Sequence, residues 1–378
     1  MNPTLPVLNP RPATLAAPGL VIVIRRGPGD PVLARERVLR GDLTDAAGEF
    51  WRDLCLGRGN PDCRPADLGL QVEPIPNGSA TAGYRGFALL AGPDSLPAGR
   101  NRLEFSTRAL EPAARRAEAR LASAGTLKSG DKCYFEIEAD PDPVDPAAGF
   151  DLDFDATVEC RPLHLLEVPL APLLETAHVV GPDPAGFFPV FYTRHVLARA
   201  EEFSRKGATV NPSFESGGVL AGVLCRCPDS AAFFVVVTDV FEVTDAEASL
   251  VSLEYSGKSW SRIQTVIRAR RQSEPAIELT GQCHGHNFLP NEGKTCDGCA
   301  SREVCTLNNV FASADDSQWT RSVFAGAPWC LCHIFGLSAR GDLLQGLFTL
   351  HDARLQQRGF HVLPDFASGG HPVKTIAR

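Results

Sequence analysis

The stretch FESGGVLAGVLC, residues 214–225, decides the fold of the second half of the chain. Gly217 and Gly218 open an apolar run that predicts a buried strand, and the β-branched and aromatic residues 232–243 predict its hairpin partner. Apolar residues at helical spacing predict a helix before this hairpin, at residues 193–203. A second helix is expected at 259–271, followed by a strand at 277–283. The pattern predicts a mixed α+β domain.

Two histidines follow the strand at 277–283 directly. His284 and His286 stand two positions apart, so both imidazoles project from one side of an extended segment. Zinc favours nitrogen ligands, and a hydrolytic zinc site typically has three protein ligands and an open position for water. Asp316, near the start of a helix expected at residues 315–324, can supply the third ligand. These residues predict a zinc site.

The order of these features resembles the JAMM (JAB1/MPN/Mov34) family of zinc metallopeptidases. That family has a Glu beside a Gly-Gly strand, then a helix, then a strand ending in HxH, then SxxD at the start of another helix. The matching residues here are Glu215, His284, His286, Ser313 and Asp316. The resemblance covers residues 188–362 and implies an MPN/JAB domain, a cytidine-deaminase-like mixed sheet flanked by helices.

The same resemblance implies a role for each matching residue. His284, His286 and Asp316 would bind the catalytic Zn²⁺. Glu215 would hydrogen-bond the metal-bound water and take its proton, and Ser313 would stabilise the oxyanion. Only Asp316, and not its neighbour, stands three positions after Ser313. Zinc chemistry suits such a set, because the metal acidifies its water and a carboxylate can carry the proton to the leaving amine.

Residues 287–312 interrupt the family pattern between the second His and the Ser. A CxxC turn is a common metal half-site, so Cys296, Cys299 and Cys305 predict a second, structural zinc site that needs one more ligand. The fourth ligand stays open between Cys283, which is nearest in sequence, and a more distant Cys225, Cys227 or histidine. An iron–sulfur cluster and reduced structural thiols are the alternatives. In JAMM deubiquitinases, insertions near the active site contact the C-terminal tail of the substrate, and the resemblance implies that role here.

The first half of the chain predicts a separate α+β domain that carries no recognisable chemistry. The domain is expected over residues 19–180, after a proline-rich tail at 1–18, with a role in partner or substrate recognition. A proline- and glycine-rich group at 181–189 marks the expected boundary, and residues 363–378 are expected to form a second tail. Strands are expected in this domain at residues 20–24, 86–91, 133–139 and 150–160, and a helix is expected at 111–122.

The composition limits the partners of the chain. With 37 basic and 45 acidic residues, the net charge is -8, which argues against nucleic acid. Neither a signal peptide nor an apolar run of about 18 residues is present, so we expect a cytoplasmic protein without a membrane partner, and thiols or metal ligands rather than disulfides. Cys330, Cys332 and His333 lie in an apolar strand at 329–335, where core packing is favoured, and Cys225 and Cys227 are interpreted in the same way.

The JAMM resemblance predicts a zinc-dependent isopeptidase or peptidase that cleaves after the C-terminal glycine of a ubiquitin-like protein, by deconjugation or by precursor processing. Abundant Ala, Arg, Pro and Gly are typical of a high-GC bacterium. There, JAB proteins accompany ubiquitin-like, E1-like and E2-like partners in antiphage operons, and we expect that setting. The alternatives are a maturation peptidase for a sulfur-carrier precursor, a noncatalytic MPN scaffold and a RadC-like DNA-associated protein. The intact site argues against the scaffold, and the acidic balance argues against DNA.

Overall fold

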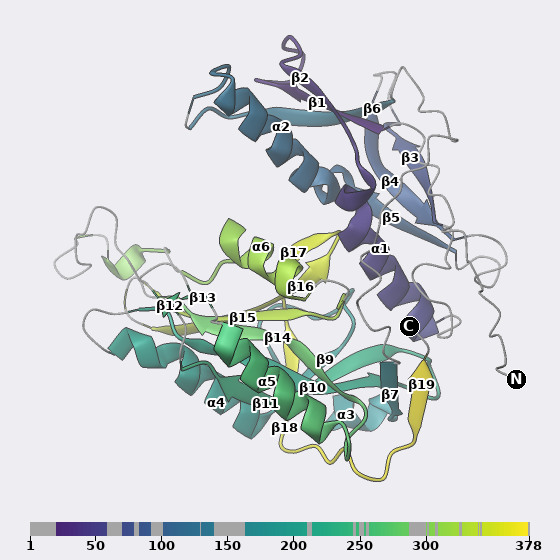
Figure 1. Cartoon of the computed structure of the whole chain (residues 1–378), viewed down its shortest axis with the longest axis vertical. Coiled ribbons are helices and arrows are strands. Elements are labelled where there is room, and N and C mark those ends of the chain that lie inside the picture. The colour runs from purple at the N-terminus through teal and green to yellow at the C-terminus, as the bar shows by residue number, and fades with distance from the viewer. Residues whose placement is uncertain are drawn as a thin grey trace, which may run out of the picture. The chain divides into compact units, whose positions relative to one another are not determined.

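The chain forms two compact units, shown together in Figure 1. The first comprises Met1–Cys55, Gly59–Arg161 and Ala377–Arg378, and the second comprises Leu56–Arg58 and Pro162–Ile376. The structure is a computed structural model, and it describes residues 20–58, 70–78, 83–91, 101–128, 130–139, 163–209, 214–244, 247–248, 253–254, 257–286, 300, 302–306, 309–324, 327–338, 340 and 342–376.

Both units combine sheets with helices, which confirms the predicted α+β class. Within the described residues, no helix has the length and apolar character needed to cross a membrane.

The first unit is built on an antiparallel sheet with the strand order β2-β1-β6-β4-β3, and β5 pairs with β4 as well. Its strands are β1 (Leu20–Arg25), β2 (Ala34–Arg37), β3 (Gln71–Pro76), β4 (Tyr84–Leu90), β5 (Arg102–Ser106) and β6 (Tyr134–Ala139). The predicted strands at 20–24, 86–91 and 133–139 correspond to β1, β4 and β6. The strand expected at 150–160 lies outside the described residues.

Helix α2 (Glu111–Ser123) packs against β1 and β2, as Figure 1 shows, and confirms the helix predicted at 111–122. Pro112 lies in its first turn, where its missing N–H costs nothing, and small buried residues such as Ala113 and Ala117 face the sheet. Helix α1 (Thr44–Phe50) continues into a π-helical segment, Trp51–Arg58, which the sequence pattern did not predict.

The second unit is built on a mixed sheet with the strand order β17-β16-β15-β14-β10-β11-β9-β18-β8; β7 also pairs with β10 and with β19. Its strands are β7 (Leu163–Glu167), β8 (His178–Val180), β9 (Val190–Thr193), β10 (Gly217–Arg226), β11 (Phe233–Glu242), β14 (Ile277–Gly285), β15 (Leu331–Leu337), β16 (Leu343–His351), β17 (Arg354–Arg358), β18 (Phe360–Leu363) and β19 (Val373–Ile376). A separate short pair joins β12 (Glu247–Ala248) to β13 (Leu253–Glu254).

The centre of this sheet is the predicted hairpin. Strands β10 and β11 pair antiparallel, and β14 pairs antiparallel with the other edge of β10 and parallel with β15. Every residue of β10 except Arg226 is buried, because helices cover both faces of the sheet here. A strand buried on both faces shows a continuous apolar run and no alternation, as residues 217–225 do.

The helices of the second unit are α3 (Leu170–Thr176), α4 (Arg194–Arg205), α5 (Gly257–Arg270) and α6 (Ala314–Val323). Helix α4 packs on one face of β10, β11 and β14. The thiol of Cys283 on β14 points to this face, 3.9 Å from the carbonyl of Ala200 on α4. Helix α5 packs on the opposite face, where Ile263 and Ile267 lie against Val219. Both predicted helices, at 193–203 and 259–271, are therefore present and hold the central strands between them.

The ends of the second unit differ from the sequence prediction. The boundary expected at 181–189 falls inside this unit, because β7 pairs with β10 and β8 pairs with β18. The proline- and glycine-rich group therefore connects two strands, β8 and β9, of one sheet. The tail expected from residue 363 contains β19, which pairs with β7.

Candidate metal centre

The end of β14 places both predicted histidines on one side of the sheet. His284 and His286 flank Gly285, which faces the opposite side and lies against the C-terminal turns of α4. A Cβ atom at Gly285 would stand 1.9 Å from the carbonyl oxygen of Ser204, so only glycine allows this close approach. The backbone N–H of His286 donates to Phe335 on β15 over 2.8 Å, which continues the pairing one residue beyond the strand.

Glu215 reaches the same place from the neighbouring strand. Gly217, at the start of β10, pairs with His284, so Glu215 stands at the edge of the sheet where β14 ends. The segment is fixed because the carbonyl of Ser216 accepts the N–H of Gly285 over 2.9 Å. The Ser216 hydroxyl accepts the Gly207 N–H over 2.7 Å as well, and it donates to the carbonyl of Ser204 over 3.2 Å.

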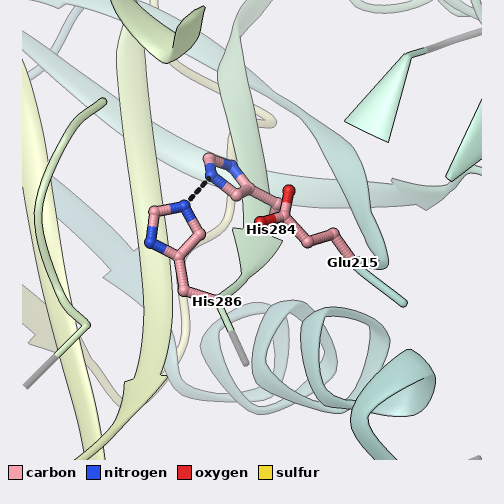
Figure 2. Close-up of side chains that lie close together, drawn as sticks. All are labelled: Glu215, His284 and His286. Atoms are coloured by element: carbon pink, nitrogen blue, oxygen red, sulfur yellow. Dashed lines mark hydrogen bonds between the residues drawn. The ribbon is translucent and has the colours of Figure 1, made fainter. Parts of the chain in front are cut away.

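The carboxylate of Glu215 faces the imidazoles, as Figure 2 shows. Glu215 is only 8% exposed. Burial raises the pKa of the Glu215 carboxyl to about 7; nearby His284 opposes this shift, and the negative charge of Asp316 adds to it. Glu215 can therefore change its protonation state near neutral pH, which is the property that a general base or acid needs.

Helix α6 brings Asp316 to the histidines by a capping box at its N-terminus. The hydroxyl of Ser313 accepts the N–H of Asp316 over 3.0 Å, and the carboxylate of Asp316 accepts the N–H of Ser313 over 2.7 Å. The Asp316 carboxylate lies 3.0 Å from Nε2 of His284 and 3.7 Å from Nε2 of His286. Asp316 therefore reaches both predicted ligands despite its distance along the chain.

Charge and hydrogen bonding keep Asp316 ionised. Burial by itself would raise the pKa of Asp316, but hydrogen bonding and charge attraction from His284, together with hydrogen bonds from Ser313, lower it below the ordinary value. Burial lowers the pKa of His286, and His284 lowers it further. The site thus favours a negative Asp316 beside a neutral His286, which are the protonation states that metal binding requires.

The geometry of the nitrogen atoms suits a single cation. Nε2 of His284 and Nε2 of His286 lie 3.0 Å apart, and the ligand atoms of Glu215, His284 and His286 all lie within 4.8 Å of one another. Ligands at about 2.0–2.1 Å from a tetrahedral ion stand about 3.3 Å apart. The two Nε2 atoms and the Asp316 carboxylate, separated by 3.0 Å, 3.0 Å and 3.7 Å, fit one metal ion on this measure. Nδ1 of His284 is buried, and no hydrogen-bond partner for it is present among the described residues.

Sequence reasoning missed Asn309 and Phe311. The backbone carbonyl of Asn309 accepts a hydrogen bond from Nδ1 of His286 over 2.8 Å, so Nδ1 carries the proton and Nε2 keeps its lone pair. The ring of Phe311, 54% exposed, lies 5.3 Å from the imidazole of His286. Both residues lie within residues 287–312, where no local sequence pattern marks them as part of a site.

The cysteine cluster is described only in part. Cys296 and Cys299 lie outside the described residues, and Cys305 is a partly exposed free thiol. Cys283 is fully buried on the α4 face, and burial raises its pKa to about 12, so an uncharged thiol is favoured there. The second metal site remains a prediction.

The other cysteines of the second unit are in the core, as predicted. Cys225 and Cys227 belong to a buried apolar cluster with Phe191 and Phe234. Cys330, Cys332 and His333 are also buried. His333 satisfies both ring nitrogens, with the Tyr192 hydroxyl at 3.2 Å and the Gln345 side chain at 3.1 Å. Burial lowers its pKa to about 3, so this histidine is a neutral core residue.

No family model and no curated protein matches the chain. A solution structure of a Desulfitobacterium hafniense protein has 13% identity and a TM-score of 0.27, and it covers 48% of this chain and 99% of its own. A solution structure of a Salinibacter ruber protein also has 13% identity, with a TM-score of 0.21, covering 48% of this chain and 94% of its own. Such low scores carry no argument about fold or function.

Proposed function

We propose that the second unit is a JAMM-type zinc peptidase. One observation carries the proposal: three separate parts of the chain come together at His284 and His286. Glu215 brings a ligand atom within 4.8 Å of both imidazoles, and the Asp316 carboxylate lies 3.0 Å and 3.7 Å from them. A buried core histidine usually finds partners such as those of His333, whereas Nε2 of His284 faces a second imidazole and a carboxylate. Groups arranged in this way suit a cation better than they suit one another.

In this proposal, His284, His286 and Asp316 hold the metal ion. A bound zinc ion would lower the pKa of water and polarise the carbonyl of the scissile amide. Glu215 would accept the proton of the attacking water and deliver it to the leaving amine. Its pKa of about 7 fits both steps, since the carboxylate and the acid are both accessible near neutral pH.

Ser313 stabilises the site in two ways in this proposal. Its hydroxyl and backbone N–H fix Asp316 at the first turn of α6. The hydroxyl would also donate its proton to the substrate carbonyl oxygen as negative charge develops there, beside the positive end of the α6 dipole. One donor of this kind contributes about 3 kcal/mol to the transition state.

The substrate class in the proposal is the amide or isopeptide bond after the C-terminal glycine of a ubiquitin-like protein. The support is the JAMM-like order of Glu215, His284, His286, Ser313 and Asp316 along the sequence. The proposal extends to a bacterial antiphage pathway with E1-like and E2-like partners, in which the first unit would contribute partner or substrate recognition.

The test uses linear fusions in which ubiquitin-like proteins ending in Gly-Gly precede a reporter, including any encoded beside this chain. We expect the wild-type chain to contain zinc and to release the reporter. Glu215→Gln should keep the zinc and cleave at least about 100-fold more slowly, because only the proton carrier is removed. His284→Ala should lose both zinc and cleavage.

A noncatalytic scaffold would cleave no fusion, whether or not it binds zinc. Cleavage by Glu215→Gln at the wild-type rate, or zinc content unchanged in His284→Ala, would reject the assigned site. His333→Gln is a matched control, since it replaces a buried histidine of the same sheet whose ring nitrogens already have partners. It should retain zinc.

A further inference from the structure

Asn309 joins the ends of two central strands beside the metal centre. Its side-chain amide donates to the backbone carbonyl of His286 at the end of β14, and its side-chain oxygen accepts the backbone N–H of Leu337 at the end of β15. Its backbone N–H also points to the carbonyl of Leu337, at 3.4 Å. Because Asn309 is only 7% exposed, these bonds are sheltered from water.

The sheet leaves room for this residue by means of glycine. A Cβ atom at Gly336 would stand 2.3 Å from Oδ1 of Asn309, and one at Gly346 would stand 2.5 Å from a methyl carbon of Val310. Both glycines lie on the face that carries His284, because His284 pairs with Ile334 and Ile334 pairs with Gly346. The two glycines therefore give residues 309 and 310 the space to approach the sheet closely, where Val310 packs against the buried cluster that includes Ile334.

The contact with His286 is made at two points. The side chain of Asn309 holds the His286 backbone, while the Asn309 carbonyl accepts the proton on Nδ1 of the His286 ring. A neutral imidazole carries one ring proton, so a proton fixed at Nδ1 leaves the Nε2 lone pair facing His284 and Asp316. Packing of the segment alone would not require a hydrogen bond to the ring nitrogen of His286.

We propose that Asn309 is the positioning residue for His286, which it holds in the Nδ1-protonated tautomer so that Nε2 is ready to bind a metal. The metal-binding consequence rests on the proposed function, whereas the tautomer is a property of the metal-free chain. Partners of this kind typically change metal affinity by about 10- to 100-fold when they are removed.

The tautomer is measured by ¹⁵N NMR of histidine-labelled, metal-stripped protein at pH 8, with the His286 signals assigned by their loss in His286→Asn. We expect Nδ1–H to dominate in the wild-type chain and a mixture of tautomers in Asn309→Ala. Zinc affinity, measured by competition with a chelator, should fall by about 10- to 100-fold. Asn309→Asp keeps the side-chain size and the acceptor for Leu337 but loses the donor to His286, so it serves if the alanine variant fails to fold.

Val310→Ala is the matched control, because it loosens the same segment without touching the bonds to His286. It should leave the tautomer and the zinc affinity within about 2-fold of the wild type. Gly336→Ala should reproduce the loss of affinity, since the new methyl group would displace the Asn309 side chain. In the double variant with Asn309→Ala, the two losses should not add.

An unchanged tautomer in both Asn309→Ala and Asn309→Asp would overturn the inference, and so would equal effects of Val310→Ala and Asn309→Ala. A wild-type chain that bound no zinc would instead reject the proposed function, and the tautomer measurement would still decide the role of Asn309.

Discussion

Replacing Glu215 by Gln should stabilise the metal-free chain, and the gain should depend on pH. Glu215 is almost completely buried, and burial raises its pKa from 4.5 to about 7. One pH unit corresponds to about 1.4 kcal/mol, so ionising this carboxyl in the folded chain costs up to about 3 kcal/mol. Gln occupies the same volume and carries no charge at any pH, so the variant avoids this cost.

The sign follows from proton binding. Because the folded pKa lies above the unfolded value, the folded chain binds more protons than the unfolded chain between about pH 4.5 and 7, and its stability falls as the pH rises through that window. Near pH 4.5 the carboxyl is largely protonated in the folded chain and the cost is small. Above about pH 7 the full cost is present. The variant should therefore gain up to about 3 kcal/mol over the wild type between pH 4.5 and pH 8.

The assay is urea unfolding of chelator-treated protein at both pH values, followed by tryptophan fluorescence, to which Trp260, Trp319 and Trp329 contribute from the second unit. Any fixed effect of the amide group is the same at both pH values and cancels in the comparison. Glu202→Gln removes an exposed carboxylate from α4 and is the control, for which the pH-dependent difference should stay within about 0.5 kcal/mol. A Glu215→Gln difference that is equal at pH 4.5 and pH 8 would refute the buried, high-pKa assignment of Glu215.

Two further predictions concern the metal sites. Asp316→Asn should lower the free energy of unfolding of the second unit by about 1 kcal/mol at pH 7, because the charged group of the α6 capping box, paired with His284, is lost. The pKa of Asp316 in the folded chain is depressed, so this loss of stability should become smaller as the pH falls below the ordinary pKa range of Asp. Urea unfolding at pH 7 and pH 3 measures the difference. Cys305→Ser should lower the zinc content of the purified chain by about one ion if the cysteine cluster forms the predicted structural site, and metal analysis that finds no change would reject that site.

The long elements of the second unit were predictable because each carries its own local signal. The apolar run after Gly217, the β-branched residues of β11 and the apolar spacing of α4 each fix an element type within one segment. The short strands were not predictable in this way. Strand β9 has four residues, all buried, and β18 has four as well, so neither shows alternation or enough length to separate strand from helix.

The domain boundary failed for a related reason. Proline and glycine mark a turn wherever it occurs, and residues 181–189 make a connection between β8 and β9. The long-range pairing of β7 with β10 and of β8 with β18 shows that the second unit begins earlier. Pairing across such a distance leaves no trace in local composition, so the position of this boundary depends on tertiary structure.

The sequence predicts five candidate site residues because their types and order are typical of metal chemistry. Two imidazoles at strand spacing, a carboxylate beside a Gly-Gly strand and a capping Ser three positions before an Asp each have a physical meaning in the sequence alone. Asn309 has no such meaning. Its role depends on the ring and backbone carbonyl of His286, on the end of β15 and on the absence of a side chain at Gly336, none of which is adjacent to it in the sequence.

Asn309 also explains how a long segment can separate His286 from Asp316 without spoiling the site. Asn309 is bound to both the ring and the backbone of His286, and seven positions then lead to Asp316 through the cap at Ser313. The entropic cost of closing the segment between His286 and Asn309 grows only slowly with its length. The hydrogen bonds between Asn309 and His286, at the two ends of this segment, offset that cost. The position of Asp316 at the histidines therefore depends on residues 309–316, with the capping box at Ser313, and not on the length of the segment before Asn309.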